Sequence, residues 1–261
     1  MANGVGVFNT ATVAEAKNST IIDVDGRELI DFAGGIGGNA AVIVDEGVDV
    51  EAAAKTVAYG AFLYAGQICI STQRIFVHEK IYAEFEAALT KAVEETKAGD
   101  PRVEVNNVGP VIDVGHLGRI DEWVQEAIDG GARVLAGGKV LSEANCLYAP
   151  TLLTDTEQEM KVCAEEVFGP VAVIEMVPNF EAAILRTNDS KFGLQAGVFT
   201  NRLDHMKMAH EDLEVGGVII NNVPGFRIDN MPYGGIKDSG LGREGIRYAM
   251  EEMTEPRLLV Y

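Results

Sequence analysis

Residues 40–78, AAVIVDEGVDVEAAAKTVAYGAFLYAGQICISTQRIFVH, decide the fold that we expect for this chain. The first seven, AAVIVDE, form the apolar run of a buried strand, and residues 48–63 repeat apolar side chains at helical spacing. Residues 73–77 are predicted to form a second strand. Because a strand, a helix and a strand in this order make a βαβ unit, we expect a layered α/β domain with a largely parallel sheet.

The same alternation continues to the end of the chain. We expect helices at residues 80–97, 116–130, 180–188, 203–212 and 243–253, and strands at 132–138, 170–177, 196–200, 217–221 and 257–261. The glycine-rich segment 222–242 is predicted to be a loop. Upstream, residues 19–32, STIIDVDGRELIDF, have Asp25-Gly26 between two apolar runs, which predicts a β-hairpin followed by the flexible join AGGIGGN.

The composition is that of a folded acidic protein. The chain has 261 residues, of which 47% are hydrophobic, enough for one large domain or two small ones with a substantial core. Its formal net charge of −19 makes nucleic acids and anionic membranes poor partners, because both repel an acidic surface. We find no apolar run of membrane-spanning length and no secretory signal, and we therefore expect a cytoplasmic protein.

The three cysteines and four histidines show no spacing typical of a disulfide framework or a metal site. An odd number of cysteines without a framework favours a reducing compartment. His205 and His210 are five residues apart, which does not align them on one helical face, and we interpret both as surface residues.

Cys69 follows Gly66-Gln67-Ile68, at the junction between the predicted helix and the β-rich segment 74–78. A nucleophilic thiol needs such a place, with small neighbours and backbone N–H groups free to receive a developing oxyanion. The alternative is a buried structural cysteine, because free cysteine is among the most buried residue types. Taken alone, Cys69 would favour the structural interpretation.

Five motifs, the one that contains Cys69 and four others, change that balance: GGNAAVIVDEGVDVEAA, FLYAGQICISTQR, EEVFGPV, NNVPGFRIDNMPYGGIKDSGLGREG and AMEEMTEPR. In these motifs, residues 37–261 resemble the aldehyde dehydrogenase superfamily. Within it, they resemble the lactaldehyde and semialdehyde dehydrogenases. The resemblance implies a three-layer α/β/α catalytic domain. It also implies that the final strand, RLLVY, pairs with a neighbouring subunit, so we expect a homo-oligomer.

The resemblance implies roles for residues around the thiol. Cys69 matches the family's nucleophile, and Glu244 matches a carboxylate that relays protons near it. Glu166, the second acid of EEVFGP, matches the carboxylate that holds the nicotinamide ribose. Phe168 lines that same pocket.

The resemblance also implies a substrate side of the site. Tyr233 matches an aromatic wall of the substrate tunnel, and Asn222 lies where the family closes the acyl pocket. Arg227 either anchors a substrate carboxylate or is a surface arginine on a glycine-rich loop.

Residues 1–36 depart from the family pattern. The stretch IIDVDGRELIDFAGGI resembles the opening hairpin of a class III, pyridoxal-phosphate-dependent aminotransferase, without its Schiff-base domain, so we infer no pyridoxal phosphate. The family's nucleotide-binding domain, with its oxyanion-hole asparagine, does not precede GGN, and Gly35 stands where the family has its general base. We expect a fusion: an arm at residues 1–36, a catalytic domain at 37–256 and an oligomerisation strand at 257–261.

Without a nucleotide-binding domain, the isolated chain is expected to bind no cofactor, although NAD(P) is the family's hydride acceptor. The other steps, attack by Cys69 and cleavage of a thioester by water, suit an activated ester. Esterase activity is also a side reaction of the family. We therefore expect a cysteine-dependent ester hydrolase, a carboxylesterase that acts on short activated acyl esters.

The expected hydrolase lacks one oxyanion-hole donor and the family's general base, and two other functions remain possible alternatives. Its oxyanion hole would retain the Cys69 backbone N–H alone, which predicts slow turnover. Glu244 is the first candidate to replace the missing base and Glu166 the second, although either is alternatively a solvated surface acid. The other functions are an aldehyde oxidoreductase fragment that borrows a nucleotide-binding domain from another chain, and a catalytically inert, oligomerising remnant.

Overall fold

The computed structural model describes residues 13–17, 20–23, 28–30 and 37–261, with side chains described from residue 37 onward. The first three segments form an antiparallel sheet of β1 (Val13–Lys17), β2 (Thr20–Asp23) and β3 (Glu28–Ile30). The antiparallel pairing of β2 with β3 confirms the predicted hairpin. Its Asp25-Gly26 turn lies outside the described residues. The sequence did not predict β1.

The main sheet has seven strands in the order β13-β12-β4-β5-β10-β9-β6. Their bounds are β4 (Ala40–Val44), β5 (Thr72–His78), β6 (Arg133–Ala136), β9 (Thr151–Thr154), β10 (Val171–Val177), β12 (Gln195–Phe199) and β13 (Gly217–Ile220). Neighbouring strands of this sheet run parallel, apart from β6, which is antiparallel to β9. The predicted α/β class with a mostly parallel sheet is confirmed.

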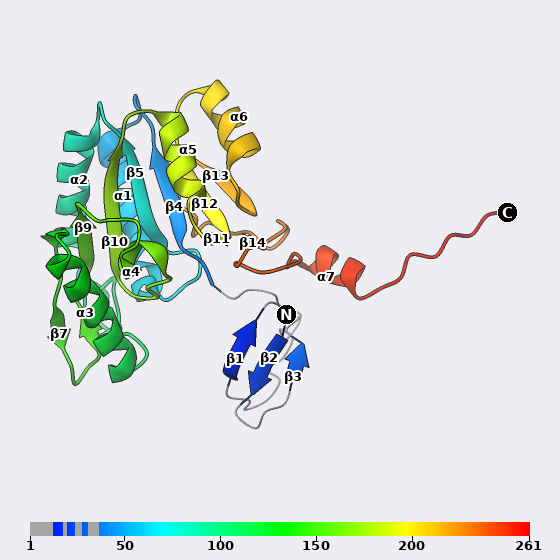
Figure 1. Ribbon diagram of the computed structural model, residues 1–261, viewed down its shortest axis with the longest axis horizontal. Coiled ribbons are helices and arrows are strands. Elements are labelled where there is room, and N and C mark those ends of the chain that lie inside the picture. Colours follow the sequence, from blue (N-terminus) through cyan, green and yellow to red (C-terminus); the bar gives the residue numbers. More distant parts are fainter. Residues whose placement is uncertain (1–12, 18–19, 24–27, 31–36) are drawn as a thin grey trace.

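Helices cover both faces of this sheet (Figure 1). They are α1 (Val50–Phe62), α2 (Tyr82–Glu95), α3 (Val114–Asp129), α5 (Phe180–Asn188) and α6 (Leu203–Asp212). Along β4, Val42 and Val44 pack into the cluster that contains α1 and α2, whereas Ala41 and Ile43 pack into the cluster of α5 and α6. Successive side chains of a strand point to opposite faces, so a strand that is apolar throughout needs a helical layer on each side.

Short elements occupy the connections, and the sequence did not predict them. A hairpin joins β7 (Val140–Ser142) to β8 (Leu147–Tyr148), and α4 (Lys161–Ala164) precedes β10. In the predicted loop 222–242, β14 (Ile236–Lys237) pairs with β11 (Phe192–Gly193) and ties that loop to the domain. Elements of two to four residues carry little periodicity, so a pattern finds some of them, such as β6 and β13, and misses others.

The strand predicted for residues 257–261 is not formed in the described single chain, and its pairing with a neighbouring subunit stays a prediction. After α7 (Ile246–Glu252), the chain runs away from the domain to its C-terminus (Figure 1). Leu258, Leu259 and Val260 are 86%, 80% and 79% exposed. A strand is held by hydrogen bonds to a neighbouring strand, and the described part of one chain offers this segment none.

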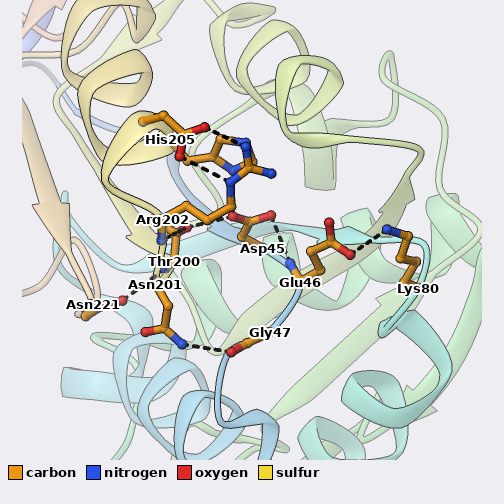
Figure 2. A network of polar contacts seen from close by, with 10 residues as sticks. Asp45, Glu46, Gly47, Lys80, Thr200, Asn201, Arg202, His205 and Asn221 are labelled. Atoms are coloured by element: carbon orange, nitrogen blue, oxygen red, sulfur yellow. Dashed lines mark hydrogen bonds and ion pairs between the residues drawn. The ribbon is translucent and has the colours of Figure 1, made fainter.

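The interpretation of His205 as a surface residue is wrong. Its imidazole is buried, with Nδ1 2.6 Å from Asp45 Oδ2 (Figure 2). Its ring is stacked on Phe180 at 4.2 Å between centroids. The same Asp45 oxygen accepts a hydrogen bond from the Thr200 hydroxyl at 2.6 Å. A buried carboxylate is stable only with such partners, and this network joins the end of β4 to α6. His210 is exposed, as expected.

Candidate active site

Cys69 follows a backbone turn made of left-handed residues. After α1, Tyr64, Ala65 and Gly66 have φ angles of 53°, 58° and 70°. This conformation costs roughly 1–2 kcal/mol for a residue that carries a side chain, so contacts with the rest of the fold must hold the turn. At Gly66 a Cβ atom would collide with the carbonyl group of Gly169, which explains glycine at this position.

Gln67 fixes this turn against the segment that leads to α3. Its backbone N–H donates to the Tyr64 carbonyl at 3.1 Å, and its Nε2 donates to the Pro110 carbonyl at 3.1 Å. Its Oε1 accepts from the Ile112 N–H at 2.9 Å. The thiol two residues later is therefore carried by a loop with a defined position.

Gly37 and Gly38 lie between Cys69 and Glu166. The Gly38 N–H donates to Glu166 Oε1 at 2.9 Å. A Cβ atom at Gly38 would collide with the Cys69 carbonyl oxygen, and one at Gly37, where φ is +140°, would collide with the Glu166 carboxylate. Only two glycines allow this close approach of the two predicted site residues.

Gln73, at the start of β5, holds the segment that carries Glu166. Its Nε2 donates to the carbonyl groups of Val162 at 2.8 Å and Glu165 at 2.7 Å, and its Oε1 accepts from the Val167 N–H at 3.0 Å. The side chain is buried. The strand that follows the nucleophile therefore also positions the carboxylate opposite it.

An open pocket of about 630 Å³ contains the thiol. It is lined by Gly37, Ile68, Cys69, His116, Arg119, Glu166 and Phe168. Cys69 is partly exposed in this pocket, whereas Cys163 is buried. The thiol is therefore not fully enclosed, and the role of Cys69 as nucleophile stays a prediction.

Several groups act on the ionisation of Cys69. Burial raises the pKa of the thiol most strongly, and the negative charges of Glu166 and Glu244 raise it further. The Cys69 backbone N–H and a contact of 2.9 Å between Sγ and the Tyr233 hydroxyl lower it. These opposing influences make the Tyr233 contact the main side-chain support for a thiolate among the described residues.

Arg227 and Glu244 lie beside Tyr233. The Arg227 guanidinium carbon is 4.1 Å from the centroid of the Tyr233 ring, and Arg227 pairs with Glu244 at 3.2 Å. Backbone hydrogen bonds join Tyr233 and Glu244 in both directions. The predicted residues thus form two groups around the sulfur, with Glu166 on the pocket side and Glu244 on the Tyr233 side.

Glu166 and Phe168 are the residues that could hold part of a nicotinamide nucleotide. In the described part of the chain, the Gly38 N–H binds one Glu166 oxygen, which leaves acceptor capacity on the carboxylate in the pocket. Phe168, held at φ 49°, is 37% exposed and lines the same pocket. A carboxylate beside an exposed aromatic ring fits a ribose diol and a planar ring.

Asn222 does not join this group. It lies just after β13, where its own Oδ1 accepts from the Val223 N–H at 2.8 Å, and it is not among the residues that line the Cys69 pocket. Its assignment to an acyl pocket stays a prediction.

The sequence did not indicate His116 and Arg119 as site residues, and both line the pocket from α3. Arg119 donates to the Val167 carbonyl at 2.6 Å, and its guanidinium carbon lies 4.5 Å from the Trp123 ring centroid. The i, i+3 spacing of His116 and Arg119 could have placed them on one helical face, but no local signal points that face toward Cys69.

The described residues contain neither a metal-binding cluster nor a helix that could span a membrane. No three or more His, Cys, Asp or Glu side chains there are arranged to hold a metal ion. No helix in that part of the chain is long and apolar enough to cross a bilayer.

Removing the charge of Glu166 is expected to stabilise the fold at neutral pH. Burial raises the pKa of Glu166, with the Gly38 N–H and Arg119 opposing the shift. An acid with a raised pKa binds its proton more tightly when folded, so the free energy of unfolding falls as pH rises through that range. Glu166→Gln keeps the acceptor for Gly38. Urea unfolding should show higher stability than wild type at neutral pH and a smaller difference near pH 4.

The matched control is Glu165→Gln, which changes a surface carboxylate paired with Lys191 at 2.6 Å and 43% exposed. It should change stability little. Equal or lower stability of Glu166→Gln at neutral pH would contradict the burial of a charged carboxylate at this position.

The chain belongs to the aldehyde dehydrogenase family, whose model matches residues 16–259. It is 44% identical over 225 residues to 3-sulfolactaldehyde dehydrogenase of Priestia aryabhattai, covering 86% of this chain and 46% of the relative. It is 34% identical over 275 residues to lactaldehyde dehydrogenase of Methanococcus maripaludis, covering 98% and 58%. The resemblance drawn from the motifs is confirmed.

Solved structures agree with these relatives. The crystal structure of aldehyde dehydrogenase 21 from Physcomitrella patens, in complex with the reaction product succinate, superposes with a TM-score of 0.81 at 40% identity, covering 85% of this chain and 46% of that one. The glyceraldehyde-3-phosphate dehydrogenase GapN of Methanocaldococcus jannaschii, complexed with NADP, gives 0.79 at 40% identity, covering 84% and 47%. The aldehyde-dehydrogenase type of fold is confirmed.

The chain spans about half the length of the relatives and solved structures that it matches. All of these relatives are aldehyde dehydrogenases, which favours the oxidoreductase alternative over the ester hydrolase expected from the sequence. The family match begins at residue 16, inside the predicted arm. The aminotransferase likeness of that arm and the domain boundaries stay predictions.

Proposed function

We propose that this chain carries the thiol-dependent catalytic part of an NAD(P)-dependent aldehyde dehydrogenase that acts on a short anionic aldehyde. The observation that supports this most directly is the Cys69 thiol on the wall of an open pocket, with Glu166 and Phe168 in the same pocket and Tyr233 in contact with the sulfur. A thiol that is reachable, supported by a hydrogen bond and set at a junction of elements is suited to covalent catalysis.

Cys69 supplies the covalent chemistry. Its thiolate attacks the aldehyde carbon, a C–S bond forms, and the carbonyl electron pair moves to the oxygen, for which the Cys69 backbone N–H is the assigned donor. NAD(P), when bound, would supply the acceptor for the hydride that leaves the former aldehyde carbon, which turns the adduct into a thioester, and we assign Glu166 and Phe168 to hold its nicotinamide ribose and ring. Water then cleaves the Cys69 thioester to a carboxylic acid and the free thiol.

Two carboxylates are candidates to take a proton from the thiol or from the attacking water. Each raises the pKa of Cys69 through its charge, so both carboxylates act electrostatically on the sulfur. We keep Glu244 as the first candidate, because a bound ribose would occupy Glu166. The pairing of Glu244 with Arg227 keeps that carboxylate oriented beside Tyr233.

An anionic substrate is proposed because the Arg227 guanidinium lies against the substrate wall at Tyr233. Its side chain is 38% exposed, which leaves the guanidinium open to a second anion beside Glu244. Two of the relatives act on, or hold, acids of this kind, namely 3-sulfolactaldehyde and succinate. A planar guanidinium recognises both carboxylate and sulfonate oxygens.

The test is protection of Cys69 from alkylation by aldehydes. Succinic semialdehyde should slow the reaction of Cys69 with iodoacetamide at a lower concentration than butanal, because the thiol is masked as an adduct and the carboxylate binds Arg227. Adding NAD(P) with the aldehyde should give NAD(P)H absorbance. No protection by any aldehyde at millimolar concentration would reject the proposal, and equal protection by both aldehydes would reject the anionic substrate.

Ester hydrolysis by the same thiol is the second candidate. It is favoured by one observation, that Cys69 lies in a pocket open enough to admit an activated acyl group without a second substrate. Attack on the ester, loss of the alcohol and cleavage by water need the thiol and a base alone. Activity on p-nitrophenyl acetate without NAD(P) would support it.

We also propose that a second copy of the chain covers residues 257–261. Leu258, Leu259 and Val260 are exposed and apolar, and a strand pairing would satisfy their backbone groups as well. A reducing, cytoplasmic location is proposed from the three free cysteines.

A further inference from the structure

The hydroxyl of Tyr233 is in direct contact with the sulfur of Cys69, at 2.9 Å. Tyr233 is 6% exposed, and its ring packs in a small cluster with Ile70 and Leu194, so its position is well determined. The likeness to known enzymes assigns this tyrosine to an aromatic wall, a role that phenylalanine would fill equally well. The hydroxyl therefore calls for a separate explanation.

The direction of this hydrogen bond depends on the ionisation of the sulfur. A neutral thiol is a weak donor and a weak acceptor, so either atom could donate. A thiolate has no proton, and the Tyr233 O–H must then donate. Hydrogen bonds to a charged acceptor are stronger than neutral ones, so the contact favours the thiolate over the thiol.

Arg227 strengthens this donor. Its guanidinium lies over the face of the Tyr233 ring, at 4.1 Å from the centroid, where a cation draws electron density from the aromatic system. Burial, Cys69 and Glu244 raise the pKa of Tyr233, so the phenol keeps its proton, and the positive charge of Arg227 acts against that rise. A phenol beneath a cation is a better hydrogen-bond donor than a phenol alone.

The remaining charges around the sulfur are mixed. Glu166, His116 and Arg119 face it from the pocket, and Glu244 and Arg227 face it from the Tyr233 side. Both carboxylates and burial act against the thiolate. A donor in contact with the sulfur is therefore needed if Cys69 is to be reactive at neutral pH.

We propose that Tyr233 is a catalytic residue, whose hydroxyl donates a hydrogen bond to the Cys69 thiolate and keeps the sulfur nucleophilic, with Arg227 above the ring strengthening the donor. This rests on the role of Cys69 in the proposed function. It adds a residue that touches the reacting atom, and it holds whichever acyl or aldehyde substrate the pocket accepts.

Tyr233→Phe tests this by removing one oxygen atom. Alkylation of Cys69 by iodoacetamide is followed over a range of pH, with the labelled peptide identified by mass spectrometry to separate it from Cys146 and Cys163. We expect the rate near neutral pH to fall about tenfold, because a hydrogen bond to a charged group is lost. The midpoint of the pH profile should move to higher pH.

Tyr59→Phe is the matched control, because it removes a hydroxyl from a tyrosine on α1 that is 64% exposed. It should leave the alkylation of Cys69 unchanged. An unchanged or faster rate in Tyr233→Phe would overturn the proposal, since a thiol that donates to the tyrosine oxygen would be released by the substitution.

Arg227→Gln gives a second test at an exposed position, should Tyr233→Phe not fold. A slower reaction, by a smaller factor than for Tyr233→Phe, supports the proposal, and an unchanged rate overturns it. Because alkylation needs no turnover, a slower Tyr233→Phe combined with failure of every aldehyde to protect Cys69 would reject the proposed function and still support the hydrogen bond from Tyr233 to the Cys69 thiolate.

Discussion

Cys69→Ala is expected to lower both NAD(P)H formation from aldehyde and hydrolysis of p-nitrophenyl acetate by at least about 10⁴-fold. The covalent intermediate in either reaction is a bond to this sulfur, and no other described group in the pocket is a thiol. Binding contacts with Arg227 and the pocket would remain, so the loss should appear in kcat rather than in KM. The measurement is steady-state kinetics of the purified variant.

Cys146→Ala is the control, because Cys146 is another partly exposed free cysteine but does not line the pocket. It should retain activity. Cys69→Ser should also be nearly inactive, because a serine hydroxyl needs a stronger base than a thiol does. Undiminished ester hydrolysis in Cys69→Ala would remove Cys69 from that reaction and leave only the aldehyde chemistry to be tested.

The second large effect is expected from Arg74→Met, which should lower the free energy of unfolding by about 3 kcal/mol or more. Arg74 is 2% exposed, and burial lowers its pKa to about 10, so it stays protonated at neutral pH. It donates to Asn39 Oδ1 at 2.7 Å and to the carbonyl groups of Arg186 at 3.0 Å and Thr187 at 3.2 Å. Methionine leaves these acceptors buried without donors.

Loss of Arg74 should also change the reactivity of Cys69 in the active site. Asn39, oriented by Arg74, donates to the carbonyl groups of Cys163 at 2.7 Å and Glu165 at 3.0 Å, next to Glu166. A freed Asn39 would loosen that segment, so we expect slower alkylation of Cys69 or a changed pH profile together with the lower stability.

Arg247→Met is the matched control for stability. Arg247 is 80% exposed at its side chain and forms an i, i+4 pair with Glu251, which is worth about 0.2–0.5 kcal/mol. Urea unfolding at neutral pH compares the variants. A change below about 1 kcal/mol in Arg74→Met would show that the carbonyl groups find water or other donors, contrary to their burial.

The predicted elements that the structure confirms are those with strong local periodicity. Val50–Phe62 and Tyr82–Glu95 fall within the helices predicted at residues 48–63 and 80–97, and the helix at Phe180–Asn188 has the predicted bounds. The predicted element that the single chain does not confirm is of another kind. The predicted strand at residues 257–261 has no partner in the described single chain, and hydropathy cannot supply one.

Some residues of the candidate site were predictable from the sequence and others were not. The motifs identified Cys69, Glu166 and Phe168, and these three share one pocket. No pattern indicated that Tyr233 would touch the sulfur from 164 positions away, or that Arg227 would lie over its ring. Nor did the sequence show that Asp45 would bury His205 across 160 positions.

The amino-acid sequence by itself determined the α/β class, the strand and helix order around residues 40–78, and the junction on which Cys69 lies, because hydrophobic periodicity and turn chemistry act between near neighbours. Only the tertiary structure decided which side chains surround the sulfur. Those contacts depend on how β5, the segment before β10 and the loop after β13 pack together, and the free energy of that packing is spread over the whole core.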